Sequence, residues 1–502
     1  MQIININVMY FRRIIIFAFL LCSLHTGVVA QDFDPPLRLE FDMAENKSMN
    51  LGLLGKNGLV VFFQKDAKDD PKWVVCHYDT NFQLLKMRSV PFETRANVCM
   101  TASDERFFYA ILQSDVATKT NISNTYILCY NAETKKIDIF SFYQEKGRIT
   151  ALAHYGNMFV YSVYYANKSE ERVYVFNTQS LTQTVLHEDK TNICVFQDAY
   201  TDTLSGSLWL VSKCYESKKQ TSIHLTQLDS NGVVLQSFPL VCDSKYTLKS
   251  CKIISSADNA MLLSGNFINN DEQRQATKNN NSGIFTTILK NNQIEELHFF
   301  EYTSFENWYT IQRRNISNSY DISYFVAQSD SLLILATDFY APEYQQSYAD
   351  QYAGAGFYAP VAESKLVGYR YQTACIYAFD KKGKLLWYSP FNYSGLLLKS
   401  ERTLLNGYID TETNEILYLF DYNNKIFSLV YKQMEVVQGI KAINVLSASR
   451  YENITATERQ LCQYWYGNNF VYSAYQFTSK KYNSKSRKSG KYVFGINKLS
   501  YK

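Results

Sequence analysis

A unit of strand, polar turn and strand recurs along this chain, and no other feature constrains its fold as strongly. Asp or Asn opens each turn, since these side chains bond nearby backbone groups and tolerate left-handed conformations. The flanking segments alternate apolar and polar residues, so each hairpin buries one face. Successive turns lie 41 to 62 residues apart, with one gap of 89, and a period near fifty is typical of a four-stranded propeller blade. The turns are centred on Asp79, Asn131, Asn177, Asp229, Asn291 and Asp380, with a weaker copy at Asp421.

Further strand-like segments lie between these hairpins, as radial repetition of blades about a channel requires. The last group supplies only three strands, QLCQYWYG, NFVYSAYQF and KYVFGINKLSY, and the early segment Leu37 to Met43 can supply a fourth. We therefore predict an all-β fold, a single β-propeller of seven or eight four-stranded blades over residues 31–502, with the N-terminal strand closing the last blade. Two stacked β domains are the alternative, although no Pro/Gly/Ser-rich linker divides the chain.

Residues 1–30 have the pattern of a cleaved signal peptide. Arg12 and Arg13 precede an apolar run from Ile14 to Leu24, and Val28-Val29-Ala30 is a small-residue cleavage signal. Lipidation of Cys22 is an alternative that the bulky residue before it disfavours. No second apolar stretch of about 18 residues follows, so we expect an exported protein without a transmembrane segment, periplasmic or outer-membrane-associated or extracellular.

The charge balance argues against nucleic acid as a partner. Removing residues 1–30 takes away two arginines and no acids, so the formal charge falls from +4 to +2. Strong phosphate binding needs a basic surface that such a balance does not provide. The one basic run, Lys480 to Lys491, contains six basic residues and is expected to be a solvated hairpin loop, with contact to an anionic surface as the alternative.

The cysteine pattern predicts at most one disulfide. Cys242 and Cys251 are the closest pair and are the candidate bridge across a connecting loop. No paired spacing of the kind that binds zinc occurs. Four other cysteines lie in apolar strand-like segments, where a thiol usually behaves as a small buried hydrophobe. These are Cys76, Cys129, Cys194 and Cys375.

Motifs that carry chemistry are absent from the sequence. It has no serine nucleophile elbow, phosphate-binding glycine loop or dinucleotide fingerprint. Acidic clusters at residues 66–70 and 410–415 lack the order that wraps calcium and are expected to be hairpin turns. The mature histidines are isolated, which favours hydrogen-bonded or surface roles: His77, His154, His187, His224 and His298. We predict no catalytic residue, no metal site and no cofactor.

A tyrosine-rich stretch, residues 339–372, accounts for the one long gap between turns. We interpret it as a loop inserted between the second and third strands of one blade. Tyrosine offers a large amphipathic contact area at low entropic cost, which favours a recognition surface. Packing of the loop against the propeller itself is the alternative. The candidate partner-binding residues are Tyr340, Tyr344, Tyr348, Tyr352, Phe357, Tyr358, Tyr369 and Tyr371.

Two resemblances accompany this interpretation. The segment Tyr377 to Trp387, YAFDKKGKLLW, resembles the hairpin of quinoprotein-like propellers, but the other copies lack its Trp, so no cofactor is implied. The last third resembles uncharacterised exported β-propeller-like proteins of Bacteroidota-type envelopes, through FYAPEY, GYRYQTACIYAFDKKGKLLW and YVFGINKLSY. That resemblance implies a propeller-like envelope protein and supplies no activity.

These observations favour a non-enzymatic exported scaffold or protein-binding propeller at the cell envelope, which docks a partner through the tyrosine-rich loop. A glycan-binding or glycan-active propeller is the alternative, and it would show two carboxylates converging at the channel mouth. A quinoprotein-like oxidoreductase is the third hypothesis, which the scarcity of repeated Trp and Gly disfavours.

Overall fold

We describe the fold from a computed structural model of the chain. The predicted signal peptide, the acidic cluster at 66–70 and His187 lie outside the residues that the structure describes. Those residues are 37–65, 72–92, 96–115, 121–186, 193–202, 205–215, 221–257, 260–270, 281–291, 293–304, 320–348, 362–423, 425–444, 452–480 and 490–501.

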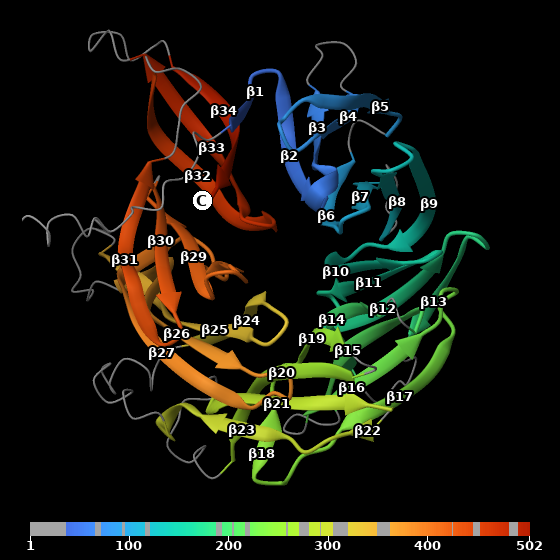
Figure 1. The fold of residues 1–502 in the computed structure, drawn as a ribbon. Helices are drawn as coiled ribbons and strands as arrows, with labels where there is room; N and C mark the ends of the chain where they lie inside the picture. The colour runs from blue at the N-terminus through green and yellow to red at the C-terminus, as the bar shows by residue number, and fades with distance from the viewer. Residues whose placement is uncertain are drawn as a thin grey trace, which may run out of the picture.

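Eight antiparallel sheets are arranged as blades around a common centre (Figure 1). Seven sheets have four strands and one has six, and within seven of them the strands follow one another in chain order or nearly so. The chain is therefore an all-β propeller, as predicted, and it has eight blades rather than seven. We number the blades 1 to 8 along the chain.

The first four blades each have four consecutive strands. Blade 1 comprises β2 (Asn46–Leu53), β3 (Leu59–Lys65), β4 (Lys72–Tyr78) and β5 (Leu84–Val90), with the 3-10 helix η1 (Gly55–Asn57) after β2; blade 2 comprises β6 (Asn97–Ser103), β7 (Phe107–Asp115), β8 (Ile122–Asn131) and β9 (Ile137–Glu145); blade 3 comprises β10 (Arg148–Tyr155), β11 (Met158–Tyr165), β12 (Glu170–Asn177) and β13 (Thr182–Leu186); blade 4 comprises β14 (Ile193–Asp202), β15 (Ser207–Tyr215), β16 (Thr221–Leu228) and β17 (Val234–Leu240).

Blade 5 divides its first and last strands into two short pieces each, and blade 8 takes its fourth strand from the start of the chain. Blade 5 comprises β18 (Tyr246–Leu248), β19 (Lys252–Ala257), β20 (Ala260–Asn269), β21 (Gly283–Lys290), β22 (Gln293–Ile294) and β23 (His298–Glu301), followed by the 3-10 helix η3 (Tyr302–Ser304); blade 6 comprises β24 (Tyr320–Gln328), β25 (Leu333–Tyr348), β26 (Ala362–Phe379) and β27 (Leu385–Leu398); blade 7 comprises β28 (Asn406–Ile409), β29 (Glu415–Tyr422), β30 (Lys425–Lys432) and β31 (Glu435–Asn444); blade 8 comprises β32 (Glu452–Tyr466), β33 (Asn469–Lys480), β34 (Lys491–Ser500) and β1 (Leu37–Asp42).

The N-terminal strand closes the ring. β1 pairs antiparallel with β34 from Leu37 opposite Lys498 to Asp42 opposite Val493, so the blue and red ends of the chain share one sheet in Figure 1. The predicted fourth strand of the last blade is confirmed. Phe41 also packs across the junction on Phe63 of blade 1, with ring centroids 5.6 Å apart. The strand thus joins blade 8 to blade 1 as well as completing its sheet.

The core consists of eight apolar clusters, one at each contact between neighbouring blades. Because successive side chains of a strand point to opposite faces, a central strand supplies two clusters at once. In β25, Ile334 and Ala336 enter the cluster shared with blade 7, while Leu333 and Leu335 enter the cluster shared with blade 5. This two-sided burial explains why the second and third strands have nearly continuous apolar sequences.

Six of the predicted turns join the third and fourth strands of their blades, and in five of them the first residue caps the turn. Asp79 Oδ1 accepts hydrogen bonds from the backbone N–H groups of Asn81 and Gln83 at 2.9 and 2.7 Å, and Asp229 and Asp380 bond their own turns in the same way. A left-handed residue follows three or four positions later, as such turns require. In five turns these residues are Phe82, Lys135, Leu181, Gly232 and Gly383.

The weaker copy at Asp421 is a different feature. It joins β29 to β30, the second and third strands of blade 7, and its carboxylate turns inward to bind Arg402 instead of capping a turn. By contrast, the acidic cluster at 410–415 is the hairpin turn that its sequence predicts. Asp410 Oδ1 accepts a 2.9 Å hydrogen bond from the Glu412 N–H there, between β28 and β29.

Aspartates also bind the backbone of the following blade. Asp198 Oδ2 accepts a hydrogen bond from the Ile253 N–H at 3.1 Å, between blades 4 and 5. Asp338 is fully buried and accepts from the Leu404 N–H at 3.0 Å, just before blade 7. Burial raises the pKa of Asp338 to about 6, because a charged carboxylate loses its hydration there. These contacts link each blade to the backbone of the next.

Candidate functional site

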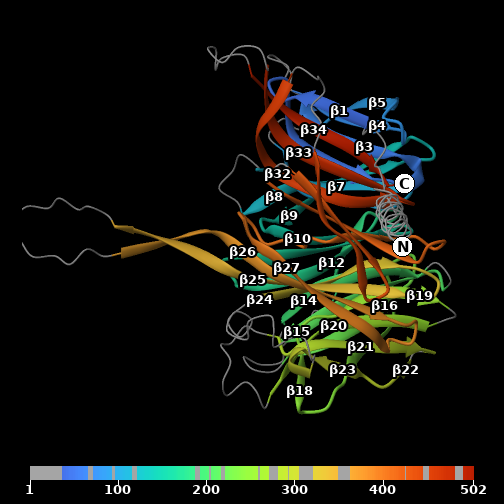
Figure 2. The same cartoon turned by 60° about the vertical axis from the view of Figure 1, so that its left-hand side comes forward.

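The described parts of the tyrosine-rich stretch, residues 339–348 and 362–372, lie in two long paired strands. β25 and β26 continue beyond their neighbours in blade 6: the pairing with β24 ends at Tyr340 and the pairing with β27 ends at Tyr369. From Glu343 opposite Gly368 to Tyr348 opposite Ala362 the two strands pair only with each other. We call residues 343–348 and 362–368 the arm, and Figure 2 shows it extending away from the ring. The predicted position, between the second and third strands of one blade, is confirmed.

The structure separates the predicted anchors into core and surface residues. Tyr371 is fully buried, and its hydroxyl accepts a 2.8 Å hydrogen bond from the Arg402 N–H and donates one of 2.6 Å to the Arg402 carbonyl. Tyr340 is 6% exposed and stacks on Tyr371. Both were predicted as partner contacts, and that prediction is wrong because the blade continues through them. Both rings pack in the apolar cluster between blades 6 and 7.

Among the predicted anchors, Tyr344 is exposed on the arm. It is 57% exposed and lies directly opposite Leu366, which is 42% exposed. Tyr369 is half-buried at the base, edge-on to Tyr340. The side chain of Tyr348 and the residues Tyr352, Phe357 and Tyr358 lie outside the described part of the chain.

The base of the arm is held by an ion pair, whereas its edges are open. Arg370 binds both carboxylate oxygens of Glu343 across the two strands. Beyond that point no other described strand pairs with either side of the arm. Open edges present backbone N–H and C=O groups that can pair with another strand, and an isolated two-stranded ribbon has little stability of its own in water.

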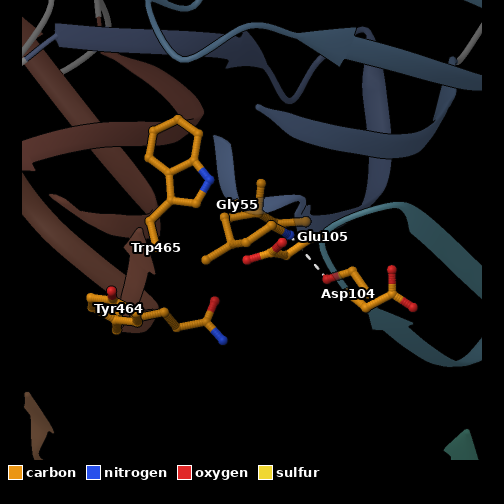
Figure 3. A pocket seen from close by; sticks show the side chains of 9 residues that line it. Gly55, Asp104, Glu105, Tyr464 and Trp465 are labelled. Atoms are coloured by element: carbon orange, nitrogen blue, oxygen red, sulfur yellow. Dashed lines mark hydrogen bonds between the residues drawn. The ribbon is translucent and has the colours of Figure 1, made fainter. Parts of the chain in front are cut away.

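A pocket on the opposite face is built largely from structural groups. The connections between first and second strands meet there, and the pocket has a volume of about 320 Å³ (Figure 3). Trp465 in its wall donates to the Gly58 carbonyl at 3.1 Å and is 5% exposed. Asp104 accepts from the N–H groups of Arg106 and Phe107 and from the Tyr109 hydroxyl. These hydrogen bonds fix the orientation of Asp104 beside Glu105 in the pocket wall.

The disulfide joins a different pair of cysteines from the one predicted. Cys194 on β14 and Cys214 on β15 face each other in register, with Cα atoms 4.1 Å apart, and form the bridge. Cys242 and Cys251 are free thiols that pack at the junction of blades 4 and 5. Sequence proximity favoured the wrong pair, because cross-strand proximity depends on register. Cys194 is buried, as predicted, but not as a thiol.

Two of the described histidines, His77 and His154, occupy structural positions. His77 bonds the Tyr130 hydroxyl at 2.9 Å and the Asn57 carbonyl at 2.7 Å. The ring of His154 lies among those of Phe107, Tyr109 and Phe159, with centroids 4.7 to 5.2 Å away. Burial lowers the pKa of His154 to about 4, because an imidazolium would be poorly solvated there.

We expect His154 to make the fold sensitive to acid. In the unfolded chain the His154 imidazole binds a proton near pH 6.5, whereas in the folded chain its pKa is about 4. The contribution of the neutral ring to the free energy of unfolding is therefore fully present above pH 6.5, and it is lost as the pH falls towards 4. The loss from this group should be about 1–3 kcal/mol. Urea unfolding of the wild type and of His154→Phe at pH 7 and pH 4.5 measures it. The wild type should lose more stability than the variant, and equal losses would contradict the assignment.

Comparisons with known proteins find only distant structural similarities. No protein-family model matches the chain, and no curated protein matches it. Among solved structures it is similar to the β-propeller domain of the Trilobed protease from Pyrococcus furiosus, at 10% identity and a TM-score of 0.35, over 78% of this chain and 98% of that one. The WD40 domain of SCAP from fission yeast is 10% identical, with a TM-score of 0.31 over 92% and 98%. Porphyromonas gingivalis dipeptidyl peptidase 4 is 9% identical, with a TM-score of 0.40 over 86% of this chain and 58% of that one.

The fold assignment rests on the strand pairing and takes nothing from these similarities. The resemblance to exported proteins of Bacteroidota-type envelopes stays a prediction. Among the described residues, no helix has the length and apolarity that a membrane span needs, and no group of three potential metal ligands comes together.

Proposed function

We propose that this chain is an exported, non-enzymatic scaffold whose arm docks a protein partner at the cell envelope. The observation that carries the proposal is the exposed Tyr344–Leu366 pair on a ribbon with two open edges. Burial of such an aromatic–aliphatic pair is the kind of contact that dominates the energy of protein interfaces. A strand from the partner that pairs with the edge of the arm would also satisfy its backbone groups.

Two features support export. The first thirty residues have the charge, apolar run and cleavage pattern of a signal peptide. The Cys194–Cys214 bridge is of a kind that persists in oxidising compartments and is rare in the cytosol. Both are consistent with a working place in the envelope, where a rigid ring with a projecting hairpin can hold a partner at a fixed orientation.

Replacement of Tyr344 and Leu366 by Ser should abolish partner capture. We expect a cost of about 2 kcal/mol or more in binding free energy, roughly a thirty-fold loss of affinity. The tagged mature chain would be crosslinked and recovered from the envelope of the cells that make it, and the proteins that accompany it would be quantified by mass spectrometry. A stoichiometric partner should be present with the wild type and lost with the double variant.

A matched control tests whether any exposed apolar pair has the same effect. Leu84 and Met87 on the outer strand β5 are 52% and 50% exposed, and Leu84→Ser with Met87→Ser should leave recovery unchanged. Recovery of the same partner by the arm variant, with folding intact, would refute docking through the arm. Recovery of no partner by the wild type would refute the scaffold itself.

A further inference from the structure

A second pocket of about 320 Å³ opens between blades 5 and 6, on the same face as the arm. Neighbouring strands of a blade are antiparallel, so the start of the first strand and the connection between the second and third strands lie on the same face of the ring. The arm is such a connection, in blade 6. The pocket walls include the start of β24, the segment that leads into β19 and, from the segment before blade 7, Thr403. The pocket therefore lies on the channel side of a blade junction, where ligand sites commonly occur.

One side of the pocket is cationic. Lys249 and Lys252 both line it, and among the described residues neither lysine forms an ion pair with a carboxylate. Asp198 interacts electrostatically with Lys252, and its carboxylate accepts the Ile253 N–H. Burial lowers the pKa of Lys249. Burial and the charge of Lys249 lower the pKa of the neighbouring Lys213 to about 8, as expected where positive charges gather without counter-charge.

The opposite side offers neutral and acidic hydrogen-bonding groups. Asp321 accepts from the Tyr302 hydroxyl at 2.8 Å and from the side-chain amides of Asn281 and Asn266 at 2.9 and 3.2 Å. Ser323 is held beside them by Asn266 at 2.9 Å. Asp321 also accepts the Asn281 N–H at 3.4 Å, so its acceptor sites are occupied. The side chains of Asn281, Asn266 and Ser323 line the pocket around it and are the groups that can bond the hydroxyls of a ligand.

An aromatic face completes the lining. Phe325 is 39% exposed although it belongs to the inner strand of blade 6, and it lines the pocket. An exposed aromatic ring beside a few convergent polar groups is a lining that suits a molecule with one apolar face and several hydroxyls. The pocket volume is at the lower end of the range for small-molecule sites, about 300–1,000 Å³.

We propose that this pocket binds an anionic saccharide unit, with Lys249 and Lys252 holding its carboxylate or sulfate, the polar side chains around Asp321 holding its hydroxyls, and Phe325 covering one face of the ring. A neutral sugar would leave the partly buried Lys249 without a counter-charge. A simple inorganic anion would leave the polar wall and the aromatic face without contacts. The proposal is independent of partner docking through the arm.

Calorimetry on the mature chain tests this with tetragalacturonate, a sulfated heparin tetrasaccharide and neutral maltotetraose. We expect at least one acidic oligosaccharide to bind at least tenfold more tightly than maltotetraose, and the preferred one identifies the anion. Sodium sulfate alone should bind at least tenfold more weakly than that oligosaccharide. Equal binding of the neutral sugar, equal binding of sulfate alone, or binding of no acidic oligosaccharide would overturn the proposal.

Variants locate the binding. Lys249→Met with Lys252→Met should reduce affinity for the acidic oligosaccharide at least tenfold, and Phe325→Ser should reduce it severalfold. The matched control is Lys381→Met with Lys382→Met, two exposed lysines at the turn between β26 and β27 on the opposite face, which should leave affinity unchanged. Unfolding midpoints of all variants confirm folding. Unchanged affinity in a folded Lys249/Lys252 variant would refute the assigned site.

Discussion

Removal of residues 37–43 should cost the ring most of its stability. The deletion takes away the whole ladder between β1 and β34 and the packing of Leu39 and Phe41 at the junction of blades 8 and 1. It also removes Arg38, whose guanidinium bonds Gln476 at 2.7 Å and Asn497 at 3.2 Å. Three partly buried side chains, with Met43 included, and about six backbone bonds together contribute on the order of 4–8 kcal/mol. Since whole domains are stable by about 5–15 kcal/mol, the ring should open.

Urea unfolding and size-exclusion chromatography of chains that start at residue 31 and at residue 44 measure this effect. The shorter chain should unfold at much lower urea and self-associate, because β34 then presents an open edge. A peptide of residues 31–46 added in excess should restore the midpoint by occupying that edge, whereas a scrambled peptide should not. A shorter chain with the wild-type midpoint would show that β1 is dispensable.

The architecture was predictable because each blade repeats its own local chemistry. Six hairpin turns could be located from an Asp or Asn and the strands beside it, and in five of them the same residue caps the turn in the structure. The missing fourth strand of the last blade was predictable from the count of strands. The prediction at Asp421 was wrong because the sequence of a connection between second and third strands can resemble that of a turn between third and fourth strands. In the structure Asp421 pairs with Arg402 and does not cap a turn.

The candidate sites were less predictable because they depend on register and on contacts between blades. Tyr340 and Tyr371 lie in a sequence that is rich in tyrosine throughout. Their burial depends on where the pairing with β24 and β27 ends, because residues before that point belong to the blade and residues beyond it belong to the arm. Cys194 and Cys214 are twenty residues apart and meet only through the pairing of β14 with β15. The lining of the pocket with Lys249 and Lys252 comes from blades 5 and 6 and from the segment before blade 7, so no single segment of sequence carries its pattern.

Arg402→Ala should be among the most destabilising single substitutions in this chain. Arg402 binds both oxygens of Asp421, at 2.6 and 3.2 Å, and the Gln460 carbonyl at 2.6 Å. Asp421 also accepts the Cys462 N–H of blade 8, and its side chain is 2% exposed. Removal of the guanidinium leaves a buried carboxylate without its counter-charge. Such losses cost about 3–5 kcal/mol.

A surface ion pair in the same protein provides the comparison. Arg106 and Glu133 pair at 3.1 Å with side chains 60% and 51% exposed, and Arg106→Ala should cost about 0–1 kcal/mol. Urea unfolding at pH 7 would give both values. Arg402→Met combined with Asp421→Leu should be less destabilising than the sum of the two single substitutions, because the pair is then removed without leaving a buried charge. Similar costs for Arg402→Ala and Arg106→Ala would mean that water reaches Asp421 and that the junction of blades 7 and 8 does not depend on this pair.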